Sequence, residues 1–95
     1  MDIGEQLKIV TNYIEENIFE ELTVEVLSAL TTYTPPQFEE IFRNTLGMSL
    51  SKYMRKCRFL ILSAMAIERG FPVNLIYVLI VYRQVDKAKA MLDYK

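Results

Sequence analysis

Hydrophobic residues recur every three or four positions along most of the chain, a spacing that is typical of amphipathic helices. The first such stretch runs from Ile3 to Ile18 and has acids and asparagine on its other side. A short second helix is expected after Thr23, and a third begins at Thr34-Pro35-Pro36, where a hydroxyl cap precedes proline at the first helical position. The pattern therefore predicts an all-α chain.

The middle of the chain continues this pattern. Gly47 suits the left-handed conformation that closes many helices, so the third helix is expected to end there. Ser49 can cap a fourth helix from 50 to about 68, which ends before Gly70. Two short helices joined by a tight turn, with a longer helix on each side, make a helix-turn-helix unit. We therefore expect this unit over 1–50 and a connecting helix over 51–70.

The last stretch, 71–95, permits more than one interpretation. Val73 to about Asp93 contains no Gly or Pro, so one continuous helix is possible there. The β-branched and aromatic residues of 75–82 would also suit a strand. This apolar run is too short to span a bilayer as a helix, and it must be buried on more than one side. The sequence thus predicts a homodimer or a protein partner that covers the 75–82 region.

Composition removes several classes of chemistry. The 95 residues include no His and a single Cys, so a Ser-His-Asp triad, an imidazole-ligated zinc site and an intrachain disulfide are all excluded. The N-terminus has neither a basic region nor an apolar stretch that would indicate a signal peptide. We expect one domain over 1–95 in a reduced, cytoplasmic protein that is not an enzyme, binds no metal or cofactor and does not enter a membrane.

The net charge of −1 hides an asymmetry. Residues 1–50 carry nine acids and two bases, which gives −7, and residues 51–95 carry three acids and nine bases, which gives +6. One interpretation is that the second half binds an anionic partner. The other is that solvated helix faces differ in sign, or that the two halves attract one another.

A specific motif lies across the first two thirds of the chain. Thr34-Pro35 is followed by Phe38, Ile41, Phe42 and Arg43, and Gly47 to Met54 with Arg58 fits the pattern Gly-x-Ser-x-x-x-Tyr-Leu-x-x-x-Arg. In these residues the stretch from Leu27 to Arg58 resembles, without a gap, the DNA-binding domain of the AraC family of bacterial transcription regulators.

The resemblance implies a fold as well. The family's homeodomain-like domain holds two helix-turn-helix units joined by a central helix, which predicts a bundle of about five helices with an irregular C-terminal half. The second unit departs from the family, because Val81-Tyr82 stands where Gly-Phe is expected and the closing segment has no counterpart before Lys95. Val81 does not readily take the positive φ that glycine supplies in such a turn. We therefore expect a degenerate second unit over 71–95.

The resemblance also predicts the residues that contact DNA. They lie on a recognition helix at about 35–46, where the base-reading positions are Pro36, Glu39 and Glu40, with Gln37 and Arg43 beside them. From their charge alone, the residues that can contact phosphate are Arg43, Lys52, Arg55 and Lys56. The competing interpretations are that the two glutamates favour the positive end of their helix and face water, and that the bases are solvated surface.

Two functions follow from these observations. The first is an AraC-type transcription regulator that binds double-stranded DNA as a dimer, because one helix-turn-helix offers few contacts. The second is an AraC-derived protein–protein interaction module, or a fragment of a longer regulator, that modulates transcription without binding DNA itself. The paired carboxylates of Glu39 and Glu40 favour the second function, and the family resemblance favours the first.

Overall fold

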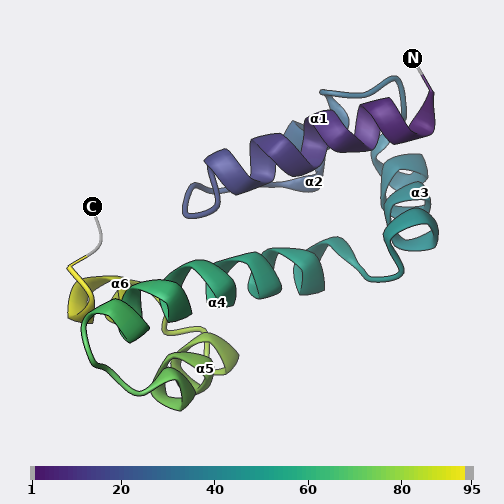
Figure 1. The fold of residues 1–95 in the computed structure, drawn as a ribbon. Coiled ribbons are helices and arrows are strands. Elements are labelled where there is room, and N and C mark those ends of the chain that lie inside the picture. The colour runs from purple at the N-terminus through teal and green to yellow at the C-terminus, as the bar shows by residue number, and fades with distance from the viewer. Residues whose placement is uncertain (1, 94–95) are drawn as a thin grey trace. The chain divides into compact units, whose positions relative to one another are not determined.

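The structure is a computed structural model that describes residues 2–93, and these contain six helices and no strand. The all-α prediction is confirmed, with six helices where about five were expected. The helices are α1 (Ile3–Glu16), α2 (Val24–Ser28), α3 (Pro35–Leu46), α4 (Leu50–Glu68), α5 (Val73–Val81) and α6 (Val85–Met91), as drawn in Figure 1.

The chain divides into two compact units, Met1–Met54 (unit 1) and Arg55–Lys95 (unit 2). The sequence predicts a separate connecting helix over 51–70. The division instead falls inside α4, so each unit contains part of this helix. Residues 94–95 of the expected second helix-turn-helix unit lie outside the described residues.

Unit 1 is built around the apolar side of α1. Within this unit α2 packs against α3, and α3 runs across the direction of α1 (Figure 1). The rings of Phe38 and Phe42 on α3 are fully buried, with their centroids 5.8 Å apart. The other buried apolar residues of the unit are Leu7, Val10, Ile14, Ile18, Leu27 and Leu50.

The helix ends in unit 1 form where local chemistry predicts them. The hydroxyl of Thr23 accepts a hydrogen bond from the Val26 amide at 3.1 Å and so caps α2. At α3, Thr34 and Gln37 form a reciprocal capping box. Gly47 closes α3 with a φ of 76°, which a residue with a side chain adopts only at a cost.

A buried glutamine that the sequence pattern does not reveal holds the turn between α2 and α3. Gln6 on α1 is only 3% exposed. Its carbonyl oxygen accepts hydrogen bonds from the Thr32 amide at 2.7 Å and from the Thr32 hydroxyl at 3.1 Å. Its amide nitrogen donates to the Tyr33 hydroxyl at 3.2 Å. Gln6 therefore fixes the backbone two residues before the N-cap of α3.

Unit 2 packs α5 and α6 with the greater part of α4. Gly70, with a φ of 75°, closes α4, and the Phe71 amide donates to the Ala66 carbonyl at 2.9 Å. The rings of Phe59 on α4 and Tyr77 on α5 meet edge to face at 5.8 Å. The buried apolar residues of the unit are Leu62, Ala66, Ile76, Ile80, Ala88 and Leu92.

The stretch after Pro72 is neither a strand nor one continuous helix, so both of these expectations are wrong. Helix α5 ends at Val81 and α6 starts at Val85, with a turn at Tyr82 and Arg83 between them. The positive φ that the turn requires, 57°, falls on Arg83 and not on Val81. The Gln84 amide donates to the Leu79 carbonyl across the turn at 2.6 Å. The turn thus forms without glycine, two residues later than the family pattern places it.

The left-handed conformation of Arg83 gives a first prediction. This conformation costs a residue with a Cβ about 1 kcal/mol, and glycine adopts it without that cost. We expect Arg83→Gly to raise the free energy of unfolding by up to about 1 kcal/mol, offset in part by the flexibility of glycine in the unfolded chain. Urea unfolding followed by circular dichroism measures the change, and Gly47→Ala, which places a Cβ at φ 76°, serves as the opposite control. A lower stability for Arg83→Gly would contradict the strained turn.

Candidate nucleic-acid interface

The outward side of α3 carries the residues that the sequence predicts to face DNA bases. Pro36, Glu39, Glu40 and Arg43 are all exposed, and their separations of three or four residues place them on one side of the helix. The buried rings of Phe38 and Phe42 fix the opposite side of α3 in the core of unit 1. The structure thus brings four of the five predicted recognition-helix residues onto one exposed helix face.

Gln37, the fifth of these residues, is exposed but already has a structural role. Its side-chain oxygen accepts a hydrogen bond from the Thr34 backbone amide at 3.1 Å, and its backbone amide donates to the Thr34 hydroxyl at 3.4 Å. A side chain that closes a capping box reaches back to the start of its helix and so does not extend outward toward a ligand. Only the side-chain nitrogen of Gln37 is left as a potential donor to a ligand.

The two glutamates of α3 face water, but not for the electrostatic reason suggested by the sequence. Helix α3 begins at Pro35, and its first turn contains no acidic residue. Glu39 and Glu40 lie in the second turn, where the field of the helix dipole has largely fallen away. The expectation that they occupy the positive end of the helix is therefore wrong. Both carboxylates remain exposed groups that accept hydrogen bonds.

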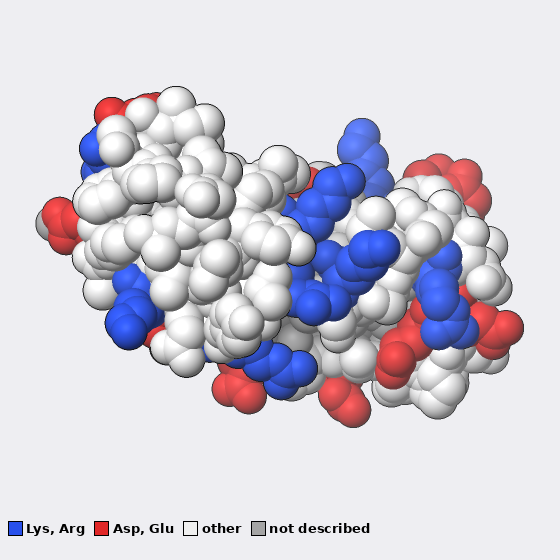
Figure 2. Space-filling view, turned by 90° about the horizontal axis from the view of Figure 1, so that it is seen from below, with Lys and Arg blue, Asp and Glu red and all other residues white. Residues whose placement is uncertain are grey.

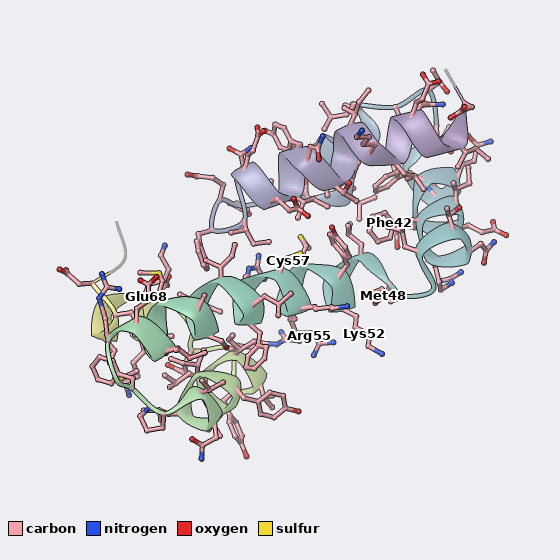
Figure 3. All side chains as sticks on the ribbon, in the orientation of Figure 1. Phe42, Met48, Lys52, Arg55, Cys57 and Glu68 are labelled. Carbon is pink, nitrogen blue, oxygen red and sulfur yellow. The ribbon has the colours of Figure 1, made fainter. Side chains whose placement is uncertain are left out.

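Three of the predicted phosphate-contacting residues lie on α4. Lys52, Arg55 and Lys56 are exposed, and their separations of three and four residues place them on one side of this helix. Figure 3 shows the side chains of Lys52 and Arg55 on the same side of α4, opposite Cys57. Figure 2 shows basic side chains on the surface. Such a row of cations suits a polyanion.

Specific contacts hold the first turn of α4, where Lys52 lies. The Ser49 hydroxyl caps this turn by accepting from the Lys52 amide at 3.2 Å. The Tyr53 ring packs edge to face on Phe42 with a centroid distance of 5.5 Å. The Tyr53 hydroxyl donates to a Glu15 carboxylate oxygen on α1 at 3.3 Å. The backbone that carries Lys52 is therefore tied to α1 and α3 within unit 1.

Arg58, which completes the sequence motif, has a different environment from these exposed bases. Its side chain is half-buried on α4. Burial lowers the pKa of the Arg58 guanidinium and outweighs the neighbouring Cys57, which acts in the opposite direction. A half-buried guanidinium presents less of its charge to a ligand than Lys52 or Arg55 does, so we exclude Arg58 from the candidate interface.

Other kinds of site do not emerge from residues 2–93. No three or more acidic or Cys side chains gather there in a way that could hold a metal ion. No helix of this part of the chain has the length and apolar character that crossing a membrane requires. Neither family models, nor curated proteins, nor solved structures match this chain.

Proposed function

We propose that the chain is an AraC-like DNA-binding protein that inserts α3 into the major groove. The observation that supports this most directly is the exposed face of α3, Pro36 to Arg43, on a helix that is capped at both ends. Gln6 fixes the turn that precedes this helix. A rigid helix with one exposed polar face is what major-groove recognition requires.

Each side chain of the interface has a role in this proposal. Arg43 donates to the O6 and N7 acceptors of guanine, a pairing that its planar guanidinium makes in two parallel hydrogen bonds. Glu39 or Glu40 accepts a hydrogen bond from the amino group of cytosine. Lys52, Arg55 and Lys56 neutralise phosphates and supply the affinity that does not depend on sequence. Two copies bind together, because a single recognition helix contacts only one half-site.

Removing Lys52 tests the phosphate contact. A protein loses about one unit from the slope of log affinity against log salt for each phosphate contact it gives up. We expect Lys52→Ala to weaken binding to all duplex sequences alike and to lower that slope by about one. Fluorescence anisotropy with a labelled duplex, titrated at several salt concentrations, measures both quantities.

The matched control is Lys8→Ala, which removes an exposed lysine from α1 in the same unit. It changes the net charge equally but lies off the proposed interface, so its salt slope should remain that of the unmodified chain. Equal slopes for the two variants would show that only overall charge matters. They would remove Lys52 from the interface.

The second candidate function is a protein–protein interaction module that does not bind DNA. The observation that favours it is the exposed carboxylate pair of Glu39 and Glu40 at the centre of the α3 face. Two adjacent negative charges oppose the approach of a polyanion and would suit a basic protein surface. Under this function the unmodified chain shows no salt-dependent binding to any duplex at low ionic strength, an outcome that would reject the DNA-binding proposal.

A further inference from the structure

Helix α5 exposes a continuous apolar face. Its outward residues are Leu75, Tyr77, Val78, Val81 and the adjoining Tyr82, with exposed fractions of 38%, 59%, 46%, 49% and 71%. We call these five residues the α5 surface. The opposite side of the helix, with Ile76 and Ile80, is already buried in unit 2. Helix α5 therefore has more apolar side chains than its own unit covers.

The size and charge of the α5 surface limit what can cover it. No residue from Phe71 to Tyr82 is charged, and the region is part of the broad white area of Figure 2. From these exposed fractions the five side chains present about 500 Å² to solvent, which is at the upper end for a monomeric protein. Two such surfaces brought together bury about 1,000 Å², the lower limit for a specific interface between proteins.

We propose that the α5 surface is covered by the α5 surface of a second copy, with the two helices antiparallel across a two-fold axis at Val78. A two-fold interface requires a patch that is complementary to itself, and an uncharged apolar helix face meets this condition without like charges at its centre. The pairing rests on the proposed function only in that DNA binding requires two copies. The pairing itself requires no DNA.

The sequence of α5 supports this register. With Val78 of each copy on the axis, antiparallel pairing sets Leu75 of one copy opposite Val81 of the other. It also sets the exposed amide of Asn74 opposite the hydroxyl of Tyr82. An amide and a hydroxyl can form a hydrogen bond at the edge of the contact, so the one polar side chain within this helix face has a suitable partner. The small side chain of Val78 lies on the axis, where it lets the two backbones approach, and the large ring of Tyr82 lies toward each end.

The charge around the surface gives the pairing a distinctive salt dependence. Unit 2 carries eight bases and three acids, a net charge of +5, and two paired copies repel each other through it. Salt screens this repulsion. Raising the salt concentration from about 50 to about 200 mM should therefore favour the pair, whereas it weakens any binding to DNA.

Cysteine cross-linking tests the register. In a full-length chain with Cys57→Ser, the variant Val78→Cys places two thiols on the two-fold axis, within reach of a disulfide. We expect it to form a covalent dimer in mild oxidant with a yield roughly tenfold above that of Ile67→Cys, because pairing raises the local thiol concentration. Ile67 is a suitable control, since it is 68% exposed on α4 and lies outside the α5 surface. Mixed Leu75→Cys and Val81→Cys should cross-link to each other more than either does to itself.

Several outcomes overturn the proposal. Equal yields of covalent dimer for Val78→Cys and Ile67→Cys would do so. A sedimentation-velocity experiment that shows only monomer at both salt concentrations would also do so. Co-sedimentation with anionic phospholipid vesicles in the absence of the Val78 cross-link would assign the surface to a membrane instead. A cross-link at Val78 in a chain that binds no DNA supports the pairing and rejects the proposed function. DNA binding by a chain that does not cross-link at Val78 supports the proposed function and rejects the pairing.

Discussion

Replacing Phe42 by alanine is expected to lower the free energy of unfolding by about 3–5 kcal/mol, the cost of deleting a buried aromatic ring. Phe42 has no exposed surface, and its ring contacts Phe38 at 5.8 Å and Tyr53 at 5.5 Å between centroids. The ring thus joins α3 to the start of α4 within unit 1, and its loss leaves a cavity that these two helices cannot both close.

The measurement is urea unfolding followed by circular dichroism, with Arg43→Ala as the matched control. Arg43 is the next residue on α3 but is exposed, so its removal should change stability by no more than about 0.5 kcal/mol. The comparison separates the two sides of α3, because Arg43→Ala should alter DNA binding while leaving the fold intact. A Phe42→Ala chain as stable as Arg43→Ala would show that the ring does not form part of a packed core.

Replacing Gln6 by leucine is expected to lower the free energy of unfolding by about 2 kcal/mol. Leucine has a similar size but cannot accept the hydrogen bonds from the Thr32 amide and hydroxyl, and it leaves the Tyr33 hydroxyl without its donor. Polar groups that lose a buried partner cost about 1–3 kcal/mol. The turn before α3 should loosen as well, so that binding through the α3 face weakens more than the stability loss alone explains.

The control for Gln6→Leu is Tyr33→Phe, which removes only the hydroxyl that accepts from the Gln6 amide nitrogen. We expect it to cost about 1 kcal/mol, close to the value of one ordinary hydrogen bond. The same urea titration compares the two variants. If they were equally destabilised, the bonds to Thr32 would contribute nothing, and Gln6 would not be the residue that orders the turn.

Sequence reasoning located the helix ends of unit 1 well, because those ends depend on local chemistry. Thr23, Thr34, Gly47 and Ser49 each occupy the cap that their residue type favours. Gln6 was missed because its partners, Thr32 and Tyr33, lie 26 and 27 residues away, and periodicity carries no information about such contacts. Its place three residues after Ile3 and four before Val10, within the apolar side of α1, was the available signal.

The C-terminal stretch was harder to predict because its turn has no residue that indicates one. Propensity favours continued helix from Val73 onward, and only the packing of both α5 and α6 in unit 2 requires a break between them. Arg83 accepts a left-handed conformation so that Ile80 and Ala88 can both be buried. A tertiary requirement of this kind overrides local preference without leaving a mark in the sequence.

The sequence predicts which residues of the candidate interface are exposed, but not the role that each has within α3. The buried positions of Phe38 and Phe42 determine which side of α3 faces outward, so the exposed positions followed from periodicity. The part of Gln37 in the capping box and the place of Glu39 in the second turn depend on the residue at which α3 starts. A shift of one or two residues in a helix start changes both roles.

The helices of the two units are capped unequally, and this affects how the stability of each unit depends on its surroundings. Helix α3 is held at both ends by its own residues, whereas α5 and α6 begin at Pro72 and Gln84 without a side-chain cap. Without side-chain caps, those two helices depend more strongly on burial, and burial increases when a partner binds. If α5 pairs with a second copy, unit 2 resists unfolding more strongly as protein concentration rises. Cellular abundance would then set how much of the chain is folded.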